Sequence, residues 1–198
     1  MTTDTEPHKR RTQLDRDAWI DTATTILADE GVAGLRIEVL AKTLNVTKGS
    51  FYWHFQDRRT LLLAVLERWR DGRMRDIIKQ TEARPGHELE QIYHVIDVYS
   101  TRRNNRGMMI ELAVRDWAHR DPDARAIVAE VDQLRLNRSR NLFLACGVNH
   151  EEASSRCMLL YAYVFGISLL ICDDFHHNIS KLKSDIADLI ARSHPALT

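Results

Sequence analysis

The apolar residues of this chain recur at the spacing of α-helices, and signals for β-strands are nearly absent. No run alternates β-branched and aromatic residues with polar ones, and no hairpin dipeptide separates two such runs. Residues that start or stop helices are frequent instead, for example Gly31, Pro85-Gly86 and Asp121-Pro122. We therefore expect an all-α fold.

Nine helices are expected, three short ones followed by six that are mostly longer. The first four are predicted at about residues 16–30, 37–44, 48–54 and 58–83. The other five are predicted at about residues 89–99, 108–119, 122–142, 151–172 and 180–193, with a polar loop at 102–107. No flexible linker interrupts this pattern, so we expect two packed bodies that meet at about residue 57.

The composition is that of an ordinary globular protein, because 44% of the 198 residues are hydrophobic and 28% are charged. Three cysteines, Cys146, Cys157 and Cys172, are too few and too widely spaced for a disulfide framework, and they fit a reducing compartment. The polar start MTTDTEPHKRR has no apolar stretch behind it and is not expected to be a signal peptide. We expect a cytoplasmic protein.

One segment, Met158–Cys172, is almost wholly apolar, and a membrane helix is one interpretation of it. It is shorter than the roughly 20 residues that a spanning helix needs, and Asp173 and Asp174 follow it directly. A helix that is apolar on all sides is more often buried within protein. We therefore expect no membrane partner.

Lysine and arginine equal aspartate and glutamate in number, 28 of each, and zero net charge by itself argues against a nucleic-acid binder. The positive charge is nevertheless gathered in two segments. Residues 8–16 hold four basic residues and one acid, and residues 36–59 hold five basic residues and two acids. Residues 17–30, between them, hold four acids and no base. This distribution keeps DNA as a candidate partner.

The second basic segment has the pattern of a helix-turn-helix. Ala41 is small enough for two helices to cross, and Asn45 tolerates the positive φ of a tight turn. The apolar residues that would lock the helices together are Leu40, Val46 and Phe51. The second helix, TKGSFYWHF with Thr47 as its N-cap, is rich in hydrogen-bonding side chains and would fit the major groove. The spacing alone is equally compatible with a surface hairpin that has no partner.

From Ala18 to Trp69 the sequence resembles the TetR family of bacterial regulators, most specifically over LNVTKGSFYWHFQDRRTLLLAV. The positions that match the family pattern are Gly31, Ala41, Val46, Gly49, Tyr52, His54, Phe55 and Leu61. The rest of the chain resembles the family in its helical organisation, with LAVRDWAHRDP as a weaker likeness. The resemblance implies an arm and three-helix DNA-binding head at 1–56, a ligand-binding and dimerisation body at 57–198, and a homodimer built from the last two helices.

The resemblance and the side-chain chemistry imply the same roles in binding double-stranded operator DNA. The residues expected to hold phosphates are Thr47, Tyr52, His54 and Arg58. Lys48, Ser50 and Trp53 are expected to face base edges, and Gly49 would let the backbone approach the duplex. The alternative for each is an ordinary surface or packing role.

Three positions depart from the family pattern. Arg36 stands where threonine commonly opens the second helix, and Arg58 stands where lysine commonly opens the fourth; both still offer donors to a phosphate. Asn45 stands where the turn often has glycine. The basic arm Lys9-Arg10-Arg11 is expected either to reach a neighbouring minor groove or to be a disordered solubilising tail.

In the body, aromatic and polar residues at helical positions could line a pocket for an unidentified small molecule. The candidates are Trp69, Arg73, Tyr93, Tyr99, Met109, Trp117 and Arg138. The alternative for each is plain core. Arg73 would select an anionic group, unless it forms a salt bridge with Glu111 or Asp116.

The eighth predicted helix is apolar on more faces than one neighbour can cover, and the ninth adds further apolar residues. Two copies packed about a two-fold axis would bury this excess. The residues expected at the dimer interface are Phe165, Gly166, Leu169, Leu182, Ile186 and Leu189. The alternative is that the eighth helix is the centre of a monomeric bundle.

No cofactor, metal site or enzymatic activity is expected. The segment with Cys172, Asp173, Asp174, His176 and His177 lacks the spacing of a known zinc site and is better interpreted as a solvated loop. No nucleophile elbow, phosphate-binding glycine loop or HExxH pair occurs. We expect a DNA-binding transcriptional regulator, a repressor that a small-molecule ligand releases from its operator. The alternative is a helical adaptor without DNA binding, which would leave the basic, aromatic segment 47–59 unexplained.

Overall fold

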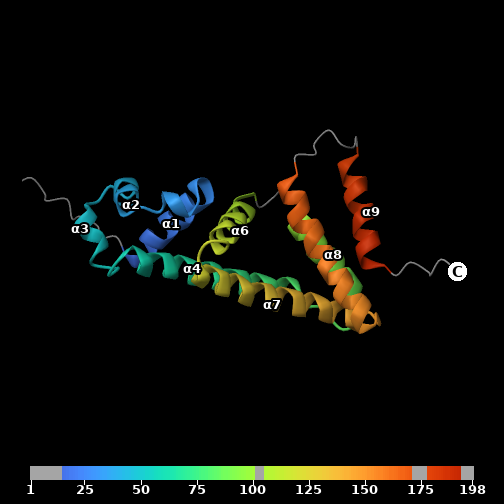
Figure 1. Ribbon diagram of the computed structural model, residues 1–198. Coiled ribbons are helices and arrows are strands. Elements are labelled where there is room, and N and C mark those ends of the chain that lie inside the picture. The colour runs from blue at the N-terminus through green and yellow to red at the C-terminus, as the bar shows by residue number, and fades with distance from the viewer. Residues whose placement is uncertain (1–14, 101–104, 171–177, 193–198) are drawn as a thin grey trace, which may run out of the picture. The chain divides into compact units, whose positions relative to one another are not determined.

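The computed structural model describes residues 15–100, 105–170 and 178–192. Within these ranges the chain is all-α, as predicted, with nine α-helices and one short 3₁₀-helix (Figure 1). The chain divides into two compact units, Met1–Val65 and Leu66–Thr198. This division falls inside the fourth helix, and the functional boundary expected at residue 57 stays a prediction.

The first unit is built from short helices. In chain order they are α1 (Arg16–Glu30), η1 (Val32–Gly34), α2 (Ile37–Thr43), α3 (Lys48–Phe51) and the start of α4 (Arg58–Gln80). Asp15 caps α1, because its carboxylate accepts a hydrogen bond of 2.8 Å from the Ala18 N–H. Gly31 ends α1 with a φ of 67°, a conformation that glycine adopts without steric cost.

Aromatic side chains form the core of the first unit. The Phe51 ring stacks on the Phe55 ring at 5.3 Å between centroids and meets the edge of Trp19 at 5.4 Å. All three side chains are buried, together with Leu27 and Leu40. Burial of each such side chain stabilises the fold by roughly 1.5–3 kcal/mol. Phe51 therefore anchors one face of α3 in this core. The opposite face of the helix does not pack in it.

The second unit holds the rest of α4 and five further helices. They are α5 (Glu88–Ser100), α6 (Asn105–Ala118), α7 (Pro122–Ala145), α8 (His150–Leu169) and α9 (Ile179–Ala191). Helix α7 is the centre, since it packs against α5, α6 and α8, while α9 packs against α5 and α8. The predicted caps are confirmed: Asp121 accepts from the N–H groups of residues 123 and 124, and Asn149 accepts from the Glu152 N–H.

Three predicted boundaries were wrong. Helix α3 ends at Phe51 rather than near His54, because the backbone continues in tighter turns in which the N–H of Tyr52 bonds the Gly49 carbonyl. Helix α6 begins at Asn105, so residues 105–107 are helical although their polar character indicated a loop. Helix α8 ends at Leu169, and Leu170 is extended.

The end of the predicted apolar segment and the Cys172–His177 stretch lie outside the described residues. So does the basic arm Lys9-Arg10-Arg11. Among the helices that are described, none combines the length and the apolar character needed to cross a membrane.

Candidate nucleic-acid interface

The turn between α2 and α3 has the geometry expected of a helix-turn-helix. Asn45 has a φ of 54°, which makes it the one non-glycine residue with positive φ in the described ranges. The Val46 N–H donates to the Ala41 carbonyl at 2.9 Å, and Ala41 is only 4% exposed where the helices cross. The prediction for Asn45 is thus confirmed, and the turn fixes α3 relative to α2.

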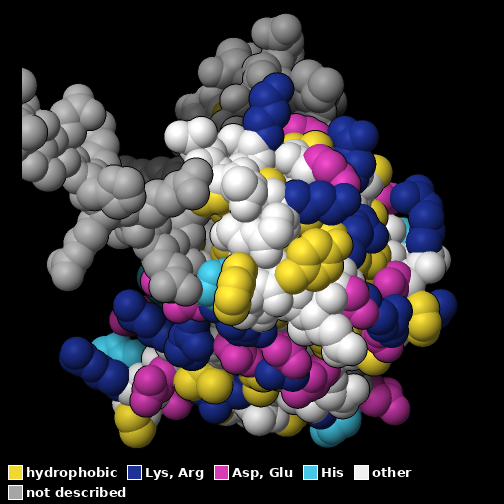
Figure 2. Space-filling model, turned by 90° about the vertical axis from the view of Figure 1, so that its left-hand side faces the viewer, with side chains coloured by type: hydrophobic (Ala, Val, Ile, Leu, Met, Phe, Trp, Pro, Cys, Tyr) yellow, Lys and Arg dark blue, Asp and Glu magenta, His cyan; other side chains and the backbone are white. Residues whose placement is uncertain are grey.

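Two large aromatic side chains project from the end of α3 into solvent. Trp53 is 82% exposed and Tyr52 is 54% exposed, although Tyr52 also meets the edge of the Phe51 ring at 5.3 Å. Figure 2 faces the side of Figure 1 on which α3 lies and shows hydrophobic side chains standing between lysine and arginine side chains. Exposed indole and phenol rings beside basic groups suit a partner that offers both apolar and anionic surface, as a DNA groove does.

The backbone at the start of α3 is open to an approaching surface. Gly49 is exposed, and a Cβ built there would meet only the Thr47 hydroxyl, at 3.8 Å. The packing of the chain itself therefore does not require glycine at this position. Thr47 is the N-cap residue of α3, as predicted, and is exposed, while Ser50 is half-buried.

Lys48 forms an ion pair that the sequence analysis missed. Its Nζ lies 2.5 Å from the Glu38 carboxylate of α2, and both side chains are more than half exposed. The hydrogen bond between them raises the pKa of Lys48 and lowers the pKa of Glu38. A phosphate or a base edge would have to compete with Glu38 for the Lys48 ammonium group. Glu38, the acid in the first turn of α2, was the available signal for this pair. In the sequence it was counted only toward the charge of its segment.

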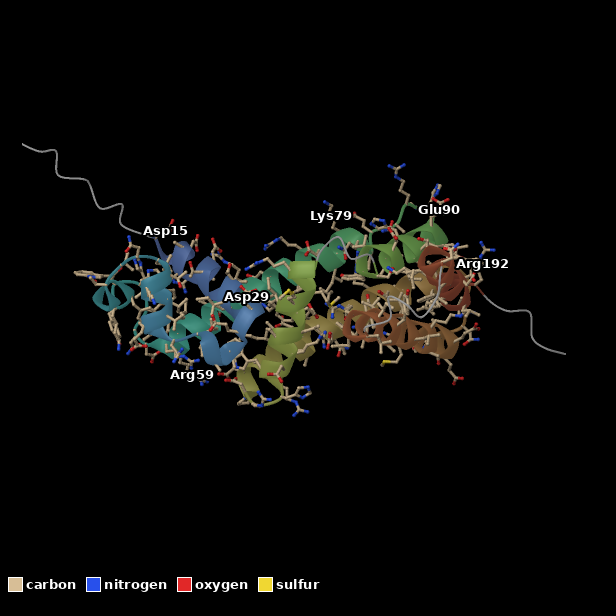
Figure 3. All side chains as sticks on the ribbon, turned by 90° about the horizontal axis from the view of Figure 1, so that it is seen from above. Asp15, Asp29, Arg59, Lys79, Glu90 and Arg192 are labelled. Atoms are coloured by element: carbon tan, nitrogen blue, oxygen red, sulfur yellow. The ribbon has the colours of Figure 1, made fainter. Side chains whose placement is uncertain are left out.

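Arg58 is placed differently from the simple phosphate contact expected. Its Nη2 donates to the Val32 carbonyl at 2.9 Å and its Nε donates to the Leu35 carbonyl. The guanidinium thereby ties the start of α4 to the segment before α2. The neighbouring Arg59, labelled in Figure 3, is exposed instead. A role of Arg58 in holding a phosphate stays a prediction.

The two remaining head residues differ in exposure. Arg36 is exposed and occupies the N-cap position of α2 without a side-chain capping hydrogen bond, so its guanidinium is not used to start the helix. His54 is half-buried in the turn after α3. The residues expected at the DNA thus lie on or beside α3, apart from Arg36 at the start of α2 and Arg58 at the start of α4.

Comparison with known proteins identifies relatives of the segment that holds this helix-turn-helix. Residues 20–65 match the sequence profile of the bacterial regulatory proteins of the tetR family. The class C tetracycline repressor of Escherichia coli is 44% identical over 55 residues, which are 28% of this chain and 25% of the repressor. The regulator AcrR of Shigella flexneri is 27% identical over 106 residues, 51% of this chain and 49% of AcrR.

The N-terminal unit is a TetR-family domain. The chain spans between a quarter and a half of the length of these curated relatives, so the match concerns the head above all. Solved structures extend the likeness in fold to the rest of the chain. A transcriptional regulator from Saccharomonospora viridis in complex with choline has a TM-score of 0.72 at 17% identity, covering 88% of this chain and 94% of its own. FadR of Bacillus subtilis in complex with stearoyl-CoA has a TM-score of 0.65 at 12% identity, covering 91% and 100%.

The residues expected to bind a ligand in the body do not form one group. Arg73 of α4 faces Glu111 of α6 at 3.4 Å, so the salt bridge offered as the alternative is present. Trp69 and Trp117 are buried, and Met109 is 40% exposed. The Tyr93 hydroxyl instead joins α5 to α9, through Asp188 and through Arg192, which Figure 3 labels.

Arg138 lines a separate groove. Its Nε donates to the Thr81 hydroxyl at 3.0 Å, and the groove beside it has a volume of about 340 Å³. The other residues that line this groove are Thr81, Glu82, Ala83, Glu88, Asn141 and Leu142. The candidates therefore divide between an ion cluster, a surface groove and the core.

The sequence analysis missed Arg135, the most deeply buried charged side chain on α7. The buried stripe of α7 includes Val128, Val131, Arg135, Ser139 and Leu142, and Arg138, the arginine expected to line a pocket, is not among them. Arg135 is 2% exposed and its Nη1 donates to Glu111 at 3.1 Å and to Asp132 at 3.0 Å. Its position on the apolar period of α7 was the available signal.

The expected dimer residues also divide. The half-buried Phe165 ring lies against two guanidinium groups of the body, 4.2 Å from Arg115 and 5.4 Å from Arg135, and its place at a dimer interface stays a prediction. Leu169 and Leu189 are strongly exposed, at 66% and 58%. The remaining three, Gly166, Leu182 and Ile186, are half-buried.

Proposed function

We propose that this chain is a transcriptional regulator that binds double-stranded operator DNA through the outer face of α3. The observation that carries the proposal is a positive-φ helix-turn-helix whose second helix and the turn directly after it present Lys48, Tyr52 and Trp53 to solvent. The names of the relatives support a regulatory role, and two of them are a repressor and a negative regulator of transcription. A helical adaptor protein would have no use for a basic, aromatic face around a glycine.

Selection from random duplex DNA tests this proposal against the adaptor alternative. The purified chain is incubated with the library, and bound duplexes are recovered and sequenced over several rounds. A TetR-type reader enriches a motif with two related half-sites, because a two-fold dimer reads two half-sites about one or more helical turns apart. Recovery of no motif above that of a Lys48→Ala/Trp53→Ala double variant would rule out sequence-specific binding.

A homodimer is the assembly that supplies the paired half-site contacts. Helix α8 carries an exposed stripe opposite its buried one, and Met158, Leu159 and Leu169 in this stripe are 59%, 51% and 66% exposed. Leu189 of α9 is exposed as well. Gly166 lies in the same stripe, and a Cβ there would meet nothing within 4 Å in the single chain. Water-exposed leucines in a stripe of two adjacent helices fit a four-helix interface with a second copy.

The dimer is tested by Leu169→Glu in sedimentation experiments, with Leu89→Glu on α5 as the matched control. Leu89 is also exposed, at 41%, but belongs to α5 rather than to the α8 stripe. We expect Leu169→Glu to be monomeric at micromolar concentration and to lose affinity for the selected duplex, while Leu89→Glu stays dimeric. A monomeric parent protein would contradict this assembly. Phe165 is unsuitable for this test because its ring packs in the body.

Release by a small molecule is the regulation that we propose. Helix α4 runs without interruption from Arg58 in the first unit to Gln80 in the second, so one helix holds both a residue of the DNA-binding head and Arg73 of the body. A ligand can shift the binding equilibrium only through its different affinity for the two states, typically about 1–3 kcal/mol. By reciprocity, saturating operator must weaken the ligand by the same factor. Equal ligand affinity with and without operator would contradict release.

A further inference from the structure

Five charged side chains from three helices meet in the interior of the body. They are Arg73 of α4, Glu111 and Arg115 of α6, and Asp132 and Arg135 of α7. Arg115 holds Asp132 with two hydrogen bonds, of 2.9 and 2.6 Å, and also donates to Glu111. Glu111 and Arg135 each have side chains that are only 3% exposed. This group is called the arginine cluster below.

The arginine cluster has one positive charge in excess, because three guanidinium groups face two carboxylates among the described residues. Arg115 and Asp132 neutralise each other's charge through two hydrogen bonds. Arg135 shares both carboxylates with Arg115, and the one buried carboxylate that Arg73 faces is that of Glu111, so one guanidinium charge stays in excess. Asp76 lies 3.8 Å from Arg73, but its side chain is 53% exposed, so water screens its charge.

Arg73 is the weakly held member. The carboxylate oxygens of Glu111 and Asp76 lie 3.4 and 3.8 Å from its nitrogens, longer than an N–H···O hydrogen bond. Its side chain is 16% exposed, against 22% for Arg115 and 3% for Arg135, so the cluster reaches solvent through both Arg73 and Arg115.

Several buried polar atoms around the cluster have no hydrogen-bond partner in the described chain. Two of them are donors, the Nε of Arg135 and the hydroxyl of Tyr99, and one is an acceptor, the Oε2 of Glu111. Burial raises the pKa of the Tyr99 hydroxyl, although the nearby positive charges of Arg135 and Arg73 act to lower it. Buried polar groups are normally paired, so a ligand with matching donors and acceptors would satisfy these atoms, including the Glu111 Oε2 that Arg73 faces at 3.4 Å.

We propose that the arginine cluster is the effector site and that the effector is a small organic hydroxy acid. Its carboxylate accepts hydrogen bonds from Arg73, the Tyr99 hydroxyl and the Arg135 Nε, and its hydroxyl donates to the Glu111 Oε2. The aromatic rings of Tyr99, Tyr161 and Phe165 border the cluster and cover the carbon skeleton. This inference rests on the proposed ligand-controlled regulation and names the ligand class.

The charge balance excludes the other simple ligand classes. A cation would add to an excess of positive charge in a poorly hydrated interior, which is unfavourable. A neutral ligand would leave that excess in place. A carboxylate cancels it and fits the planar guanidinium of Arg73 with two hydrogen bonds.

The test is the melting temperature of the full-length protein with hydroxy acids and with their uncharged amides at equal ionic strength. The probes are glycolate, lactate, 3-hydroxybutyrate and salicylate, each against its amide. We expect at least one acid to raise the melting temperature by roughly 5–10 °C at about a hundred times its Kd, and its amide to have no such effect. Equal effects of acid and amide, or no effect of any acid, would overturn the proposal.

Two variants place the site. Tyr99→Phe removes one unpaired hydroxyl without changing the ring, and Arg73→Gln removes the most weakly held of the proposed carboxylate partners. Each should weaken the active acid, Arg73→Gln by about ten- to a hundredfold, while the control Arg138→Gln in the separate groove keeps the parent affinity. Unchanged affinity in both Tyr99→Phe and Arg73→Gln would overturn the assignment to this cluster.

The DNA assay separates this inference from the proposed function. An acid that binds the parent protein, depends on Arg73 and leaves duplex binding unchanged would support the site and contradict ligand release. A chain that selects a DNA motif but binds no hydroxy acid would keep the proposed DNA binding and overturn the inference about the ligand.

Discussion

Removing a carboxylate from the arginine cluster should destabilise the protein more than removing an arginine. Glu111 faces three guanidinium groups and is 3% exposed. In Glu111→Leu, the three guanidinium groups keep only Asp132, so two positive charges are uncompensated. In Arg135→Leu, two guanidinium groups face two carboxylates, and the cluster is balanced.

The structure gives the expected size of this difference. Removing one partner of a buried ion pair commonly costs about 3–5 kcal/mol, and we assign that range to Glu111→Leu. Arg135→Leu loses two hydrogen bonds, of 3.1 and 3.0 Å, and a ring contact with Phe165, but it also removes the excess charge and an unpaired Nε. We expect a net cost of about 1–2 kcal/mol for it. For a chain of this size the two costs correspond to falls in melting temperature of about 6–20 °C and 2–8 °C.

Urea unfolding followed by far-UV circular dichroism measures both costs, at one fixed protein concentration because dimerisation contributes to apparent stability. Arg120→Leu is the control, since Arg120 and Asp116 form an exposed pair with side chains 73% and 60% accessible, and it should change stability very little. If Arg135→Leu were as destabilising as Glu111→Leu, the cluster would have no excess positive charge, and the argument for a carboxylate ligand would fail with it.

Three further predictions concern local features. Burial acts to raise the pKa of Glu111, but the three surrounding arginines outweigh it and hold the pKa below its usual 4.5. The stability that this carboxylate contributes is therefore complete above pH 4.5 and is lost as the pH falls through the pKa of the folded state. Glu111→Gln should show a flatter acid unfolding curve. Asn45→Ala should cost about 1 kcal/mol in urea unfolding because alanine is strained at a φ of 54°, whereas Asn45→Gly should be nearly neutral. Asp121→Ala should cost about 1 kcal/mol, since its carboxylate caps α7 through two backbone N–H groups; an unchanged midpoint would mean that the cap is dispensable.

Features of the fold that depend on a few neighbouring residues could be predicted from the sequence. Asn45 could be assigned to the turn because few residues adopt positive φ, and Asp121 could be assigned as a cap because proline follows it at the first helical position. The anchoring of α3 by Phe51 followed from its place among the apolar residues of the helix-turn-helix pattern. Each of these is decided within about one helical turn.

Features that depend on distant partners could not be predicted. Arg135 lies on the buried stripe of α7. In the sequence alone, a charged residue at that position indicates a break in the apolar stripe, because Glu111, its partner, lies on another helix. The contacts of the Phe165 ring could not be predicted either, because the two arginines that hold it come from α6 and α7. The Lys48–Glu38 pair likewise joins two helices across the turn.

The central claim is that the outer face of α3 reads DNA, and the affinity of a selected duplex for three variants tests it most directly. Trp53→Ala and Lys48→Ala change α3, while Lys79→Ala changes an exposed lysine near the end of α4, labelled in Figure 3. Kd is measured over a range of salt concentrations. We expect both α3 variants to bind about ten- to a hundredfold more weakly with unchanged far-UV signal, and Lys79→Ala to bind like the parent. Parent-like affinity in both α3 variants would contradict the account.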